Sequence, residues 1–244
     1  MKQNPADQQC SKPVICFDFD DTLCDPNDQP ISGARETLLA LQSEGFNIVV
    51  SSARFSPMYG ELNGHRMRKV EEWLAFHAMP VDEVVLHVPD AAAYVDDLAL
   101  VFDGDWDDLS TRLMALFPHR SSDKKPRRLS VPLESLVDVD SGLARPGAVG
   151  GIENITDLGF EWVVNAGALV DDSFDDQVLA SWPLQLQSLG FRHLRVEIHK
   201  ISSSGYVDLR AVRFEGDWDS VLEQVFMLLN HGPQSSLTGR FSRP

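Results

Sequence analysis

The sequence predicts an α/β fold in which parallel strands alternate with helices. Short apolar runs of strand length are followed by segments with apolar residues at helical spacing, the pattern of strand–helix–strand units. Several apolar runs in the first half end at acidic or hydroxyl residues, and the second half repeats part of the first. Together these observations predict a Rossmann-like, three-layer α/β/α architecture with a parallel sheet, present in two tandem copies.

Composition places the chain with ordinary globular proteins, at 43% hydrophobic and 24% charged residues. No apolar run approaches the roughly 20 residues of a membrane helix, and residues 1–12 are polar, expected to be disordered, and lack a signal-peptide core. The three cysteines form neither an even disulfide framework nor a zinc-spaced pair of pairs. We therefore expect a cytoplasmic protein with reduced thiols and no membrane partner.

Net charge argues against one class of partner. The chain carries a formal charge of -16 and a pI near 4.7. A polyanion would be repelled over most of such a surface, so a nucleic-acid partner is not expected.

The first half divides into alternating elements. Residues 14–23, VICFDFDDTL, are typical of a buried strand that runs into a turn with three carboxylates. Residues 31–46 indicate a helix, with Ser32 as its N-cap and Gly45 as its stop. The further expected elements are a strand at 47–52, a loop at 55–64, a helix at 65–77, strands at 84–88, 91–95 and 99–102, and a helix at 106–117.

Polar side chains follow three of these strands where each one ends. In a parallel sheet, ligands bind outside the carboxyl ends of the strands. The sequence therefore predicts one crevice that is lined by Asp18, Asp20, Ser51, Ser52, Asp96 and Asp97.

An internal repeat supports two copies of the domain. Residues 94–117 match residues 206–229, with nine of the first 14 positions identical. Without gaps, His87 and Val88 then pair with His199 and Lys200. With shorter loops, the further matches are 45–52 with 159–166 and 17–23 with 137–143.

We expect four segments from this repeat: a domain with the candidate site at 13–117, a linker at 118–133, a degenerate copy at 134–231 and a tail at 232–244. The second copy keeps Asp138 and Asp140, but has Ala166 in place of Ser52 and Leu209 in place of Asp97. It therefore lacks groups that would hold an anion and a metal. We expect the two copies to pack against each other within the chain, and the sequence also allows an oligomer.

These residues resemble the motifs of the haloacid dehalogenase-like (HAD) superfamily, whose members are mainly phosphatases. Its first motif, DxDx[TV], is similar to Asp18, Asp20 and Thr22, and its second to Ser52. The acidic pair of its fourth motif is similar to Asp96 and Asp97. The resemblance covers residues 13–117 and leaves no room for a large cap domain.

The resemblance implies a Mg²⁺-dependent phosphatase, a hydrolase of small phosphorylated substrates that works through an aspartyl-phosphate. Asp18 is then the nucleophile and Asp20 the general acid and base. Mg²⁺ is implied to bind Asp18, the backbone carbonyl of Asp20 and Asp96, with Asp97 close by. The phosphoryl group is implied to contact Ser52 and the loop after the first strand, which includes Asp21.

One position departs from the family pattern. The third motif of the family supplies a lysine, and the matching position here holds Val88. Three alternatives follow. Arg66, Arg68 or Lys69 supplies the charge and binds phosphate; Lys200 of the second copy reaches across; or the chain is a catalytically impaired pseudophosphatase that serves as a metal-binding, phosphate-binding or protein-interaction module.

Overall fold

The computed structural model describes residues 12–56, 63–117, 127–170, 176–192 and 194–231. The expected disorder of residues 1–12, Lys12 apart, and the expected tail at 232–244 lie outside the described residues.

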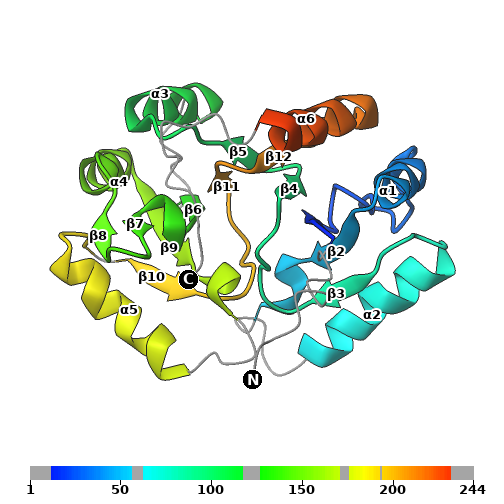
Figure 1. The fold of residues 1–244 in the computed structure, drawn as a ribbon, viewed down its shortest axis with the longest axis horizontal. Helices are drawn as coiled ribbons and strands as arrows, with labels where there is room; N and C mark the ends of the chain where they lie inside the picture. The colour runs from blue at the N-terminus through cyan, green and yellow to red at the C-terminus, as the bar shows by residue number, and fades with distance from the viewer. Residues whose placement is uncertain (1–11, 57–62, 118–126, 171–175, 193, 232–244) are drawn as a thin grey trace, which may run out of the picture.

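Two parallel five-stranded sheets form the centre of the molecule (Figure 1), which makes it an α/β protein. The first sheet has the order β12 (Ala211–Arg213), β4 (Ala93–Asp96), β1 (Val14–Phe17), β2 (Asn47–Ser51), β3 (Glu83–Val85). The second sheet has the order β5 (Ala99–Val101), β11 (Gly205–Asp208), β6 (Arg127–Pro132), β9 (Phe160–Asn165), β10 (Arg195–Glu197). A short antiparallel pair, β7 (Val137–Asp138) and β8 (Leu143–Ala144), follows β6 along the chain.

The helices are α1 (Ala34–Ser43), α2 (Asn63–Phe76), α3 (Trp106–Leu116), α4 (Ala148–Asp157), α5 (Asp176–Ser188) and α6 (Trp218–His231). The expected stop of α1 at Gly45 is confirmed, because the helix ends at Ser43 and Gly45 has a φ of 92°. The expected cap at Ser32 is wrong. The N-cap is Gly33, whose φ of 89° is the left-handed conformation that glycine adopts most easily.

The two halves of the chain exchange their last strand and helix. β5 pairs with β11 in the second sheet, and β12 pairs with β4 in the first. The helices follow their strands, so α3 packs beside α4 and α6 beside α1 (Figure 1). The buried side chains of Trp106 and Trp218 accordingly lie in the core of the opposite half. The sheets therefore do not divide the chain between residues 117 and 118.

The layers also differ from the expected α/β/α arrangement. Ile15 and Phe17 share one core with α1, α2 and α6, whereas Cys16 and Tyr94, which alternate with the core residues along β1 and β4, line a cavity that Ser130 and Tyr206 of the second sheet also line. Each sheet thus has helices on one face and the other sheet on its second face. The physical reason is the connection at residues 86–92, which contains no helix to cover that face.

The expected linker at 118–133 is wrong over its described part. Residues 127–132 form β6, the central strand of the second sheet, which pairs with β9 along its whole length. A central strand buried on both faces needs apolar residues, and Leu129 and Val131 are fully buried. The sequence did not predict this strand because its first two residues, Arg127 and Arg128, are basic.

Among the helices that the structure describes, none is long and apolar enough to cross a lipid bilayer. Cys16 and Cys24 are both buried and free of disulfide bonds.

The first prediction concerns the contact between α3 and α4. A Cβ atom added to Gly151 would lie 2.3 Å from the ring of Trp106, whereas one added to Gly150 meets nothing within 4 Å. We expect Gly151→Ala to lower the free energy of unfolding by about 1–3 kcal/mol, because the ring must move out of a packed core. Gly150→Ala should raise it by up to about 1 kcal/mol through helix propensity. Urea denaturation measures both; equal stabilities of the two variants would contradict the exchange of α3.

Candidate active site

Two buried carboxylates stand at the carboxyl ends of neighbouring strands. Asp18 directly follows β1 and Asp96 ends β4, and the Asp18 N–H donates to the carbonyl of Val95 at 2.9 Å. Both side chains are almost fully buried. Because side chains alternate along a strand, Asp18 shares its face with Cys16, the face turned toward the second half.

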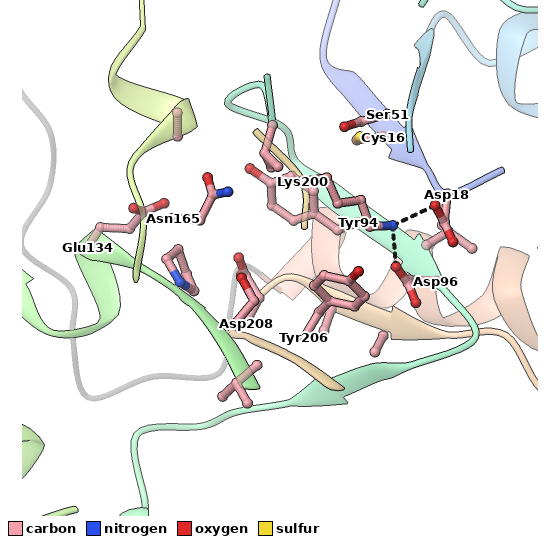
Figure 2. A pocket seen from close by; sticks show the side chains of 18 residues that line it. Cys16, Asp18, Ser51, Tyr94, Asp96, Glu134, Asn165, Lys200, Tyr206 and Asp208 are labelled. Carbon is pink, nitrogen blue, oxygen red and sulfur yellow. Dashed lines mark hydrogen bonds and ion pairs between the residues drawn. The ribbon is translucent and has the colours of Figure 1, made fainter. Parts of the chain in front are cut away.

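The cation between these carboxylates comes from the second half. The Lys200 Nζ lies 2.7 Å from Asp18 Oδ1 and 2.5 Å from Asp96 Oδ2 (Figure 2). Only 9% of the Lys200 side chain is exposed, so the three groups form a buried ion cluster rather than a surface pair. Of the four residues that the sequence offered as sources of this charge (Arg66, Arg68, Lys69 and Lys200), Lys200 forms ion pairs with Asp18 and Asp96.

A close contact between the halves carries Lys200 into place. The segments that follow β3 and β10 run antiparallel, with His87 opposite His199 and the Val88 N–H donating to the Ile198 carbonyl at 3.0 Å. Gly167 permits this approach, since a Cβ there would lie 2.4 Å from the Val88 carbonyl oxygen. Lys200, the residue after His199, therefore points toward the first half, and Val88, the residue after His87, points toward the second half.

The other candidate cations belong to α2. Arg66 lines the same open cleft as Asp18 and Asp20, and its Nη1 donates to the Arg54 carbonyl at 3.4 Å. Arg68 and Lys69 are exposed on α2 and do not line this cleft. Phosphate binding by Arg66 stays a prediction that its position allows, whereas the position of Lys69 gives it no support.

Three carboxylates could hold a metal ion. One oxygen from each of Asp18, Asp96 and Asp97 lies within 4.8 Å of the others. Burial raises the pKa of Asp18 to about 7 despite the opposing effect of Lys200, and burial together with Asp96 raises the pKa of Asp97 to about 6. Burial alone would lower the pKa of Lys200, but Asp18 and Asp96 raise it well above its usual value.

The donor set fits a hard divalent cation. Three carboxylates face one ammonium group, which leaves an excess of negative charge in a buried place. Mg²⁺ binds oxygen ligands from a few carboxylates and keeps several waters, so these residues match what that ion needs.

Asp20 is held on the open side of the site. The Arg54 guanidinium donates to both of its carboxylate oxygens, with Nε 2.9 Å from Oδ1 and 3.0 Å from Oδ2. The Ser52 hydroxyl donates to Asp20 Oδ2 at 3.3 Å and accepts the Arg54 N–H at 3.1 Å. Ser52 thus orients Asp20 in two ways: its hydroxyl donates to the Asp20 carboxylate, and it accepts the N–H of Arg54 in the turn that carries the arginine. The phosphate contact that the sequence predicts for Ser52 stays a prediction.

The loop after β1 is closed by its own hydrogen bonds. The Asp21 N–H donates to the Cys24 carbonyl at 2.8 Å, so it is already satisfied, while its exposed carboxylate lines the cleft. Thr22 is buried and its hydroxyl accepts the N–H of Asp97 at 3.2 Å, which joins the two acidic loops. The phosphate contact predicted for Asp21 therefore stays a prediction, and the backbone N–H of this residue is already bonded to the Cys24 carbonyl.

Strand register shows what the second half carries at the same place. β6 pairs Val131 with Val164 and Pro132 with Asn165, whereas β1 pairs Phe17 with Val50, the residue that corresponds to Val164. Pro132 therefore stands where Asp18 stands, and Glu134 where Asp20 stands. The sequence match of 17–23 with 137–143 is wrong at the motif. Asp138 instead accepts the Ser141 N–H and hydroxyl in the turn between β7 and β8.

An arginine occupies the corresponding acidic cluster of the second half. The Arg210 guanidinium donates to Glu134 at 2.7 Å and to Asp90 at 2.8 Å, and it pairs with Asp208. The Asp208 carboxylate also accepts the backbone N–H of Arg210 at 2.7 Å. Burial raises the pKa values of Glu134 and Asp208, and the guanidinium opposes that rise. The Arg210 guanidinium thus pairs with the carboxylates of this cluster, as Lys200 pairs with Asp18 and Asp96 in the first half.

Comparisons with known proteins find only distant likeness. No protein-family model matches the chain, and no curated protein matches it. A solved structure of a hypothetical protein from Pyrococcus horikoshii OT3 is similar at 17% identity, over 73% of this chain and 56% of that one, with a TM-score of 0.21.

Two further solved structures are similar at lower identity. A phosphonoacetaldehyde hydrolase-like protein from Oleispira antarctica shares 13% identity over 84% of this chain and 59% of that one, with a TM-score of 0.23. A possible sugar phosphatase of the HAD superfamily from Cytophaga hutchinsonii shares 11% over 90% of this chain and 64% of that one, also with a TM-score of 0.23. The chain thus spans less than two thirds of each structure, and the function proposed below rests on the site itself.

The second prediction concerns Arg210. Arg210→Met should lower the free energy of unfolding by about 3–5 kcal/mol, because it leaves Glu134 and Asp208 buried without their cation. Arg195→Met is the matched control. Its pair with Glu197 is formed by a side chain that is 54% exposed, so the loss should stay below about 1 kcal/mol. Thermal and urea unfolding of the two variants, side by side, test this, and a similar loss in both would contradict a buried charge cluster.

Proposed function

We propose that the chain is a Mg²⁺-dependent phosphomonoester hydrolase that works through an aspartyl-phosphate on Asp18. The observation that carries the proposal is the buried cluster of Asp18, Asp96 and Lys200 at the carboxyl ends of β1 and β4, with Asp97 beside it. The motif resemblance of residues 13–117 agrees with it.

Asp18 is the nucleophile in this proposal. One of its carboxylate oxygens forms a bond to phosphorus while the bond from phosphorus to the leaving oxygen breaks. Asp20, in its protonated form, gives its proton to that leaving oxygen. In the second step Asp20 takes a proton from water, the water oxygen attacks phosphorus, and the bond to Asp18 breaks, which returns the free carboxylate and inorganic phosphate.

The neighbouring groups orient and balance these charges. Lys200 lowers the repulsion between the Asp18 carboxylate and an anionic substrate, because its ammonium group is buried within 3 Å of Asp18. Arg54 and Ser52 hold Asp20 at the mouth of the cleft. Asp18, Asp96, Asp97 and the Asp20 carbonyl would hold Mg²⁺, which supplies further neutralisation of the phosphoryl oxygens.

The alternative of an impaired pseudophosphatase rested on Val88 in place of a lysine. Lys200 supplies an ammonium group to the same carboxylates, so the hydrolase is the function that the geometry supports best. The substrate class in this proposal is a small phosphate monoester, and Arg54 and Arg66, which line the open cleft beside Asp18, add positive charge near the place of its phosphate.

The third prediction tests the nucleophile. Asp18→Asn should reduce hydrolysis of p-nitrophenyl phosphate with Mg²⁺ to the background rate, because an amide does not attack phosphorus. Asp138→Asn is the control, since the sequence repeat aligns this residue with Asp18 but the structure places it in a turn. It should keep the full rate. Turnover by Asp18→Asn, or no turnover by the unaltered chain across a panel of phosphate esters, would contradict the proposed function.

The fourth prediction separates the possible cations. Lys200→Met should lower kcat by about 100- to 1000-fold, as removal of a charge that acts on the transition state does. Lys69→Met, which removes an exposed lysine of α2, should leave kcat unchanged. Steady-state kinetics at saturating Mg²⁺ compare them, with circular dichroism to show that both variants are folded. The opposite ranking would show that α2 supplies the charge.

A further inference from the structure

The segment that carries Lys200 is folded around its own tyrosine. The Tyr206 hydroxyl donates to the Ile201 carbonyl at 2.5 Å. The Lys200 Nζ lies 4.6 Å from the centroid of the Tyr206 ring, so the ring forms one side of the ammonium site. Residues 200–206 therefore make one small unit with Tyr206 at its centre.

This unit forms part of the candidate active site. Ser202, Ser203 and Tyr206 line the open cleft together with Asp18 and Asp20. The Ser204 N–H donates to the Arg128 carbonyl at 2.6 Å, which anchors the segment to β6. One wall of the cleft in the first half is thus built by the second half.

The first half contains a similar construction around Tyr94, which meets Arg210 of the second half instead of the site at Asp18. The Tyr94 hydroxyl donates to the Pro89 carbonyl at 2.7 Å and accepts the Ala91 N–H at 3.2 Å. Its ring lies 5.0 Å from the guanidinium of Arg210 instead of a lysine. Each tyrosine hydroxyl therefore donates to the carbonyl five residues before it, but Tyr206 contacts the cation that bonds Asp18 whereas Tyr94 contacts Arg210.

We propose that Tyr206 is a positioning residue of the active site: it holds residues 200–204 in the shape that places Lys200 between Asp18 and Asp96. The second half is then a working part of the site in the first half. This inference rests on the proposed function. A lysine side chain has four rotatable bonds, and a small misplacement of a group that acts on the transition state costs a large factor in rate.

The fifth prediction uses the two tyrosines as a matched pair. Tyr206→Phe keeps the ring but removes the hydroxyl that closes the segment, and should lower kcat about ten- to hundredfold with a smaller change in KM. Tyr94→Phe removes the corresponding hydroxyl and should leave kcat within about twofold. Thermal unfolding of both variants measures the stability that each one loses. A purely structural role of Tyr206 would change the stability and the kcat of both variants alike.

A double-mutant cycle connects the effect to Lys200. In the Lys200→Met background, Tyr206→Phe should cause no further loss in kcat, because the group that it positions is absent. A full additional loss there, or equal kcat in Tyr206→Phe and Tyr94→Phe, overturns the inference.

A binding measurement keeps this inference distinct from the proposed function. Calorimetric titration with inorganic phosphate in the presence of Mg²⁺ should show weaker binding by Tyr206→Phe than by Tyr94→Phe. If the unaltered chain neither binds phosphate nor hydrolyses any ester, the proposed function fails and the inference fails with it. If the unaltered chain does both and Tyr206→Phe equals it in each, the inference alone is wrong.

Discussion

The ion cluster of Asp18, Asp96 and Lys200 is the constraint on which the packing of the two halves depends. Two carboxylates buried side by side on a sheet face repel each other, and their burial is costly unless a cation pairs with both. Within the described chain, the cation that contacts them is carried by the second half, 104 residues from Asp96. The halves must therefore meet in one register, with the residues after β3 antiparallel to those after β10.

The bare face of each sheet makes that meeting possible. Since no helix crosses back between β3 and β4, the even-numbered side chains of β1 and β4 are left for another surface to cover, and the second sheet covers them. The exchanged strands β5 and β12 extend each sheet with a piece of the other half, and α3 and α6 bring Trp106 and Trp218 into the opposite cores. Separation of the halves would break both cores as well as the ion cluster.

Sequence reasoning reached the local features, the packing of the two halves and, as one alternative, the reach of Lys200, but it missed the exchange of strands between the halves. The strands of the first half, their acidic ends and the meeting of Asp18 with Asp96 follow from short-range patterns, because parallel strands end at one edge. The exchange of β5 and β12 has no local signal, since each strand looks the same whichever sheet receives it. The sequence match placed Asp138 opposite Asp18 because the aspartates at 138 and 140 resemble the first motif. The strand pairing that places Pro132 opposite Asp18 is a long-range property, which a local match does not contain. Lys200 was within reach of the repeat, which aligns it with Val88.

That alignment gives Val88 a physical explanation. The two connecting segments run antiparallel, so each one presents its residue at this position to the other half: Lys200 faces the site of the first half, and Val88 packs against Gly167 of the second. Val88 lines the same cavity as Glu134 and Asp208, the two carboxylates that pair with Arg210. Position 88 therefore bears on the packing of the second half, whereas the ammonium group beside the Asp18 carboxylate comes from Lys200.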